Sequence, residues 1–266
     1  MPNMATTTHP RRICNLVPSK GTERDWTFDD AVAGGMVAAR AALPESKDLR
    51  ATWWKVGDQG QTGSCVGWAT ADGVGRYLMV EAGRIKRTQR LSPRFIWMSS
   101  KERDEFRDRP TSFVEEAGTS LKAAMDVARK YGYALERELP FEVDTAMFTG
   151  PENALFASAS RRRVSYVNLG LDLQRWKRWL ATKGPILAGL WVDDSWMSLG
   201  SDGLLSDWTG ATYGGHAVTI VGYRADGRFI VRNSWGTTWG HKGFAYVSPD
   251  YLHAGFYPES YGATAS

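Results

Sequence analysis

The chain has 266 residues, of which 42% are hydrophobic and 12% aromatic, so it is long enough to bury a sizeable core. Its 33 Lys and Arg residues are nearly balanced by 29 Asp and Glu residues and form no long basic tract, which argues against nucleic acid as a partner. The longest apolar stretches fall far short of the roughly 20 residues that a membrane-spanning helix needs, so we expect no membrane span.

Residues 1–46 are predicted to be an N-terminal extension. Asp29-Asp30 is followed by a run of Ala, Gly and Val that ends at Pro44, a pattern typical of one short helix. No continuous apolar run follows the basic residues near the N-terminus, so a secretory signal is not indicated. We therefore expect a cytoplasmic protein, with non-classical secretion left open.

The first half of the main body is predicted to be helical. A short strand over residues 51–57 leads into a glycine-rich turn, residues 57–63, and a broad apolar face then predicts a helix from Cys65 to about Glu81. Further helices are expected over residues 94–105, after Ser92-Pro93, and over 121–131, after a Thr119 or Ser120 cap. These elements define a helical lobe over about residues 58–150.

The second half is predicted to be β-rich. Glycine turns separate β-branched and aromatic runs, and one helix over 173–182 interrupts them; the runs cover residues 164–169, 186–192, 216–223, 228–233 and 243–247. We expect a β lobe over about residues 160–250, joined by the 51–57 strand, and a C-terminal tail over 251–266. The fold class is α+β.

Cys65 stands at the first turn of its predicted helix, where backbone N–H groups and the helix dipole favour a thiolate. Taken alone, a cysteine is more often a small buried hydrophobic residue. Gln59, six positions upstream across the turn, offers a side-chain NH₂ that can join the Cys65 backbone N–H in holding an oxyanion. The other cysteine is Cys14, and a bridge to it would consume this thiol, so a reducing compartment fits best.

His216 begins a predicted strand behind a glycine turn, and Asn233 ends another strand 17 residues later. The Asn233 carbonyl can accept a hydrogen bond from the imidazole and fix its tautomer, while Trp235 and Trp239 cover that bond from water. A core histidine and a plain Asn-Ser turn are the alternatives. The order and spacing of all these residues favour a thiol nucleophile activated by an imidazole.

With these residues in view, the chain resembles the papain-family cysteine peptidases over roughly residues 47–250. The resemblance lies in Gln59 through Cys65, Gly215-His216-Ala217-Val218, and Asn233-Ser234-Trp235-Gly236. It implies a papain-like fold with an N-terminal helical lobe, a C-terminal antiparallel β-barrel-like lobe, and an active-site cleft between them.

The resemblance also implies roles for individual residues. Cys65, His216, Asn233 and Gln59 are expected to be catalytic, and a second set is expected to bind substrate: Gly63, Ser64, Gly118, Gly215 and Trp235. The family's disulfide cysteines are missing, with Thr62 at one such position, as in its disulfide-free microbial members. No metal or organic cofactor is expected, since Cys and His clusters at zinc spacing are absent from the sequence.

The predicted activity is endopeptidase hydrolysis of a peptide or protein through a Cys65 thioester, with an apolar side chain two positions before the scissile bond by family resemblance. The protein is expected to be a monomer and to be made as a precursor in which residues 1–46 block the cleft. Two alternatives stay open: acyl transfer, or cleavage of an isopeptide or cell-wall amide, by the same Cys-His pair, and a latent binding protein with a blocked cleft.

Overall fold

The computed structural model describes residues 12–38, 42–103, 117–142 and 150–266. In order along the chain, the elements of the first half are η1 (Thr22–Arg24), α1 (Phe28–Ala33), β1 (Lys47–Asp48), α2 (Cys65–Gly67), η2 (Trp68–Gly75), α3 (Arg76–Glu81), α4 (Pro93–Arg103), α5 (Leu121–Lys130) and α6 (Glu152–Ala159). Those of the second half are β2 (Val164–Asn168), α7 (Leu173–Thr182), β3 (Ile186–Val192), α8 (Asp194–Met197), β4 (Leu204–Leu205), β5 (Gly214–Tyr223), β6 (Phe229–Arg232), β7 (Phe244–Val247), α9 (Pro249–Gly255) and β8 (Phe256–Ala265).

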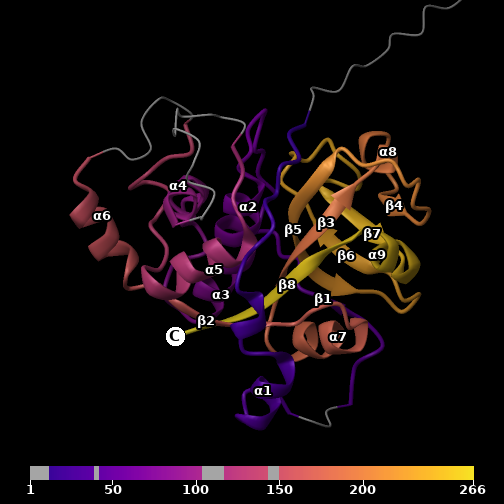
Figure 1. The fold of residues 1–266 in the computed structure, drawn as a ribbon, viewed down its shortest axis with the longest axis horizontal. Helices are drawn as coiled ribbons and strands as arrows, with labels where there is room; N and C mark the ends of the chain where they lie inside the picture. The colour runs from indigo at the N-terminus through magenta and orange to yellow at the C-terminus, as the bar shows by residue number, and fades with distance from the viewer. Residues whose placement is uncertain (1–11, 39–41, 104–116, 143–149) are drawn as a thin grey trace, which may run out of the picture.

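The predicted division into helices and strands is confirmed. Helices α2 to α6 gather on one side of the molecule and strands β3 to β7 on the other, while β2 lies next to α5 on the helical side (Figure 1). One eight-stranded sheet has the order β2-β8-β3-β5-β6-β7-β4, and β1 pairs separately with β5. Its pairs are antiparallel except for β4 with β7, which are parallel. The architecture is therefore α+β.

The helix that starts at Cys65 runs without a break to Glu81, as predicted, but its middle part, Trp68–Gly75, is π-helical. The predicted cap of α5 is Ser120, whose hydroxyl accepts a hydrogen bond from the Ala123 N–H at 3.3 Å. Ser92 caps α4 in the same way, accepting from the Phe95 N–H at 3.0 Å. The predicted end of that helix, near Glu105, lies outside the described residues.

Two predicted boundaries are wrong. Residues 251–266 are not a tail: they complete α9 and form β8, which lies between β2 and β3 inside the sheet. The predicted strand over 51–57 is absent. These residues form a turn closed by a hydrogen bond from the Trp54 N–H to the Ala51 carbonyl, and the strand that pairs with β5 comes earlier, at Lys47–Asp48.

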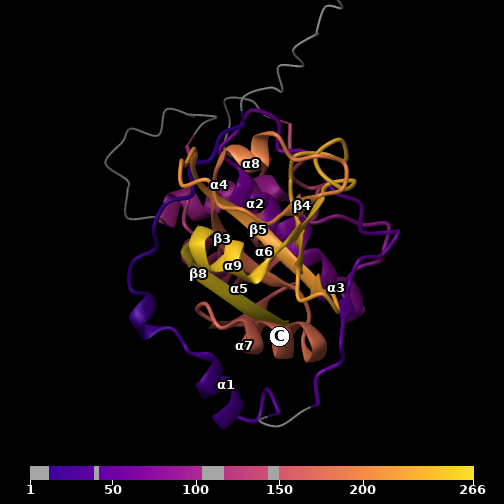
Figure 2. The same cartoon turned by 90° about the vertical axis from the view of Figure 1, so that its right-hand side faces the viewer.

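The N-terminal extension has two parts. Residues 12–20 run as irregular backbone between the two sides of the molecule, shown in indigo in Figure 1. Residues 21–38 continue to α1, at the bottom of both views (Figures 1 and 2). In the second part Phe28, Ala31 and Val37 are buried in the core of the β lobe. The predicted short helix begins at Phe28, before the alanine-rich run, because the Thr27 and Asp30 side chains form a capping box there, and it ends at Ala33.

No helix among the described residues is long and apolar enough to cross a membrane.

Candidate active site

The side chain of Cys65 lies at the beginning of α2, directly after the glycine-rich turn, and is completely buried. Its sulfur lies close to the backbone N–H of Ala217, the residue that follows His216, and this N–H favours the thiolate. The structure therefore brings the thiol of the helical lobe to the histidine strand of the β lobe.

His216 and Asn233 are hydrogen-bonded, with 2.8 Å between His216 Nε2 and Asn233 Oδ1. Asn233 Oδ1 also accepts a hydrogen bond from the Ser234 backbone N–H at 2.7 Å. Because a backbone N–H can only donate, this second bond fixes which end of the Asn233 amide is the oxygen. His216 Nε2 must then carry the proton, which leaves the lone pair of Nδ1 free to accept one.

An aromatic wall surrounds this hydrogen bond. The ring of Trp235 lies 4.9 Å from the His216 ring, and that of Trp196 lies 5.8 Å away, edge to face. Trp239 stacks on Trp196 at 5.3 Å, so it supports the wall from behind. The predicted shielding by Trp235 is thus seen directly, and the contribution of Trp196 was missed because it comes from α8, a helix that was not predicted.

Gln59 is held in place by three hydrogen bonds to two neighbours. Its Nε2 donates to the Thr62 carbonyl at 2.8 Å, its Oε1 accepts from the Ser234 hydroxyl at 2.7 Å, and its backbone N–H donates to the Ser234 carbonyl at 2.8 Å. One hydrogen of the side-chain NH₂ is used by Thr62, and the other is available to an oxyanion. The turn that carries Gln59 is therefore bonded to the segment that carries Asn233.

Residues 12–16 of the extension lie across this site. The Arg12 guanidinium donates to Asp58 Oδ1 at 2.8 Å and to the Trp235 carbonyl at 3.1 Å, two residues that form a β-bridge with each other. The Leu16 N–H donates to the Gly215 carbonyl at 2.9 Å, one residue from His216. Cys14, between these two anchors, is close enough to Cys65 for a charge on one thiol to affect the other.

Glycines on both lobes make room for the extension. A Cβ atom added at Gly118, on the helical lobe, would lie 1.9 Å from the Asn15 carbonyl oxygen, and one added at Gly214, on the β lobe, would lie 1.9 Å from the Cys14 carbonyl oxygen. The Leu16 side chain is buried against Gly189, Gly215 and Tyr257. The backbone of the extension therefore passes closely between the lobes.

Three of the five residues predicted to bind substrate contact the extension: Gly118 with Asn15, Gly215 with Leu16, and Trp235 with Arg12. The other two, Gly63 and Ser64, are buried behind the nucleophile, and the Ser64 hydroxyl pairs with that of Thr62 at 2.6 Å. The residues of the extension that fill the site were not singled out from the sequence, because residues 12–17 carry no motif.

Burial controls the protonation of the pair in this closed arrangement. It raises the pKa of the Cys65 thiol to about 11, although nearby backbone N–H groups act in the opposite direction. Burial also lowers the pKa of His216 to about 4, against the effect of the Asn233 hydrogen bond and with some help from the Arg12 charge. Burial in the closed state thus opposes the thiolate that the helix N-terminus was predicted to favour.

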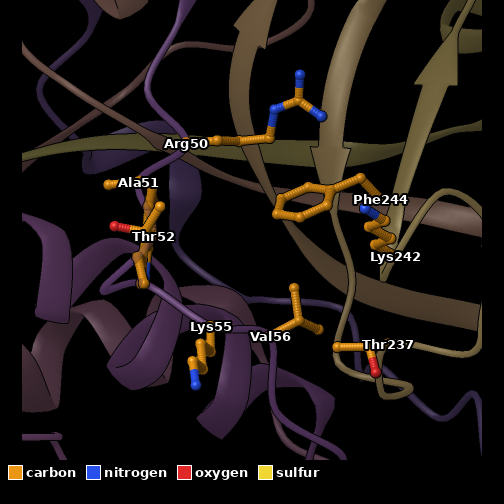
Figure 3. Close-up of a pocket in the computed structure, with 9 residues that line it drawn as sticks. Arg50, Ala51, Thr52, Lys55, Val56, Thr237, Lys242 and Phe244 are labelled. Atoms are coloured by element: carbon orange, nitrogen blue, oxygen red, sulfur yellow. The ribbon is translucent and has the colours of Figure 1, made fainter.

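A separate hollow of about 440 Å³ lies beside the segment that precedes the glycine-rich turn and is lined in part by Arg50, Lys55, Lys242 and Phe244. Figure 3 shows the charged ends of Arg50 and Lys55 directed away from each other. Arg50 is already paired with Asp48 at 2.7 Å. The cationic side chains that line the hollow therefore do not converge on one point.

In the part of the chain that the structure describes, no group of three or more His, Cys, Asp and Glu side chains is arranged to hold a metal ion.

The comparisons with known proteins agree with this geometry. The sequence model of the papain family cysteine proteases matches residues 43–260, so the chain belongs to that family and is a cysteine peptidase. It is 27% identical over 242 residues to cathepsin B-like CP2 of Giardia intestinalis, covering 86% of this chain and 74% of that protein. It is 29% identical over 242 residues to cathepsin B-like CP3 of the same organism, covering 86% and 76%.

Solved structures show the same fold. Xylellain, a cysteine protease from Xylella fastidiosa, superimposes with a TM-score of 0.76 at 21% identity, covering 97% of each chain. Digestive procathepsin L2 from the larval midgut of Tenebrio molitor gives a TM-score of 0.72 at 24% identity, covering 95% of this chain and 78% of that one. The predicted papain-like fold is confirmed.

Proposed function

We propose that this cysteine peptidase is an endopeptidase made as an autoinhibited precursor, in which residues 12–20 are the inhibitor. The observation that supports the proposal is the path of the extension: Arg12 and Leu16 are bonded to residues that flank the catalytic groups, and Cys65, His216 and Asn233 are buried beneath it.

The reaction follows from the hydrogen-bond network. Once the extension leaves, water enters and the penalty for charging the thiol and the imidazole falls, so a proton passes from Cys65 to His216 Nδ1. The thiolate attacks the scissile carbonyl, while the remaining side-chain N–H of Gln59 and the Cys65 backbone N–H hold the oxyanion. His216 then protonates the leaving amine, and a water deprotonated by His216 hydrolyses the thioester.

Asn233 keeps the ring aimed during these steps. Because Asn233 Oδ1 is bonded to both the Ser234 N–H and His216 Nε2, rotation of the imidazole would break a buried hydrogen bond next to Trp235. In this mechanism Nδ1 alone exchanges protons with Cys65, substrate and water, and Nε2 keeps its proton throughout.

The position of Leu16 supports an apolar requirement in the substrate. Its side chain is buried against Gly189, Gly215 and Tyr257, beside the strand that carries His216. We propose that a substrate places an apolar side chain in the same place.

The test is labelling of Cys65 by a thiol-reactive peptide probe. The full chain should react slowly, and a version that starts at Gly21 should react fast. That version keeps Phe28, Ala31 and Val37, which belong to the core of the β lobe. A Cys65→Ser variant of the full chain is the control for labelling at Cys14, which the Gly21 version lacks. Equal labelling of both versions would contradict autoinhibition, and labelling of neither would favour a latent binding protein.

The unlabelled Gly21 version also separates hydrolysis from acyl transfer. A fluorogenic peptide incubated with the Gly21 version should give free acid as its product, even with an added amine. A product carrying the amine would support the acyl-transfer alternative.

A further inference from the structure

The strand that carries the imidazole rests directly on the helix that carries the thiol. Successive residues of a strand point to opposite faces, so Ala217 and Thr219 of β5 share one face. The Ala217 N–H lies at the Cys65 sulfur, and the Thr219 hydroxyl donates to the Ala69 carbonyl at 3.1 Å. Ala69 is four residues after Cys65, which places these two contacts about one helical turn apart.

The fit around Thr219 is tight. Its side chain is completely buried. A Cβ atom added at Gly73, four residues after Ala69, would lie only 2.1 Å from Thr219 Oγ1. The helix and the strand thus approach as closely as they do because position 73 has no side chain and position 219 carries a short one.

Thr219 is firmly held within the sheet. Thr219 pairs with Leu187 of β3 and with Arg232 of β6, so it lies in the interior of the sheet. Arg232 in turn binds Asp72 of the same helix at 2.6 Å. A shift of the helix at Thr219 therefore cannot be absorbed by movement of an edge strand.

The Thr219 hydroxyl binds the π-helical part of the helix. Ala69 belongs to the π-helical segment Trp68–Gly75, and such segments are rare and are often found at functional sites. Valine has the same shape as threonine but would place a methyl group against the Ala69 carbonyl oxygen, without a hydrogen bond. The helix would then have to move away from β5, and Cys65 would move with it.

We propose that Thr219 is a positioning residue of the peptidase reaction: by holding the Cys65 helix against the His216 strand, it sets the separation of thiol and imidazole. The inference rests on the peptidase activity assigned above. A misplacement of about 1 Å at reacting atoms can cost on the order of 100-fold in rate, so a smaller shift should give a loss of about tenfold.

The experiment compares Thr219→Val with two other single variants of the full-length chain. Thr219→Ser keeps the hydroxyl and should behave like the parent. Thr70→Val is the matched control, because the Thr70 hydroxyl is buried in the same helix but makes no hydrogen bond among the described residues. The melting temperature of each variant shows whether it is folded.

The first measurement is independent of turnover. Nuclear magnetic resonance of ¹⁵N-labelled histidine gives the ring shifts and titration midpoint of His216, which depend on the distance to Cys65. We expect these to change in Thr219→Val and to match the parent in Thr219→Ser and Thr70→Val. Unchanged His216 signals in a folded Thr219→Val chain, or an equal change in Thr70→Val, would overturn the proposal.

The second measurement is kcat and KM for a fluorogenic peptide, with Leu16→Ala added to every chain to loosen the extension. Thr219→Val should lower kcat about tenfold and leave KM within about twofold. If kcat is unchanged, Thr219 does not position the pair. If no chain turns over peptide, the parent included, the proposed release of the extension fails, and the His216 signals still decide the role of Thr219.

Discussion

Replacing Leu16 by alanine should open the site, because this side chain is the main apolar anchor of the extension in the cleft. Leu16 is 6% exposed and packs against Gly189, Gly215 and Tyr257. Leucine-to-alanine changes at buried sites cost about 2–5 kcal/mol. Leu16 lies on an irregular segment that can partly adjust, so we take the lower third of this range, about 2–3 kcal/mol, for the loss of closed-state stability.

Since about 1.4 kcal/mol corresponds to a factor of ten, the population of open molecules should rise roughly 30- to 150-fold. The rate at which a thiol-reactive peptide probe labels Cys65 should rise by the same factor, as long as labelling is limited by opening. The assay is the initial labelling rate of the full-length variant at several probe concentrations.

Trp26→Ala is the control for this prediction. Trp26 belongs to the same extension, but its side chain is 66% exposed, so its removal should change the labelling rate less than threefold. The reasoning is refuted if Leu16→Ala labels no faster than the parent, or if Trp26→Ala accelerates labelling as much as Leu16→Ala does.

Three further predictions concern the catalytic groups and the core. Gln59→Ala should lower kcat of the opened enzyme by on the order of 10² to 10³ with the fold retained, since one oxyanion donor is lost; a loss below tenfold in steady-state turnover would contradict this role. Alkaline pH should weaken the closed state: because Cys65 has a pKa of about 11 there against 9.0 for an exposed thiol, the open state loses a proton first, and stability falls between about pH 9 and 11, by on the order of 3 kcal/mol in total. Hydrogen exchange of the Leu16 amide, corrected for its intrinsic rate, measures this, and a flat profile would count against it. Asp72→Asn should cost about 3–5 kcal/mol in urea unfolding, since the buried carboxylate binds Arg76, Arg90 and Arg232; a loss under 1 kcal/mol would show that these cations are stable without it.

The elements that sequence reasoning located well are those whose signals are local. The helix over 173–182 and the strand over 186–192 were predicted with the bounds that the structure shows. Both depend on interactions within a few residues, namely helical spacing of apolar side chains and a continuous β-branched and apolar run. The catalytic residues were found in the same way, from short motifs whose residue types already define the chemistry.

The last strand was missed because its local signal is poor. Pro258 has no N–H to donate, and Glu259 is charged, so residues 256–265 do not read as a central strand. The structure accommodates them in a bulge: Gly189 of β3 pairs with Tyr257 and Ala188 pairs with Ser260, which leaves Pro258 and Glu259 outside the ladder. Pairing on both sides with β2 and β3 outweighs the weak strand preference.

The sequence by itself thus determined the chemistry of Cys65, His216, Asn233 and Gln59, because a nucleophile, a base and an oxyanion donor can be recognised by residue type and spacing. Only the tertiary structure decided their protonation, since the pKa of Cys65 depends on burial beneath residues 12–20, which lie close to it in space and far from it along the chain. The contact of Thr219 with Ala69 is likewise set by packing between the lobes, and such a contact between residues 150 positions apart leaves no pattern in either segment.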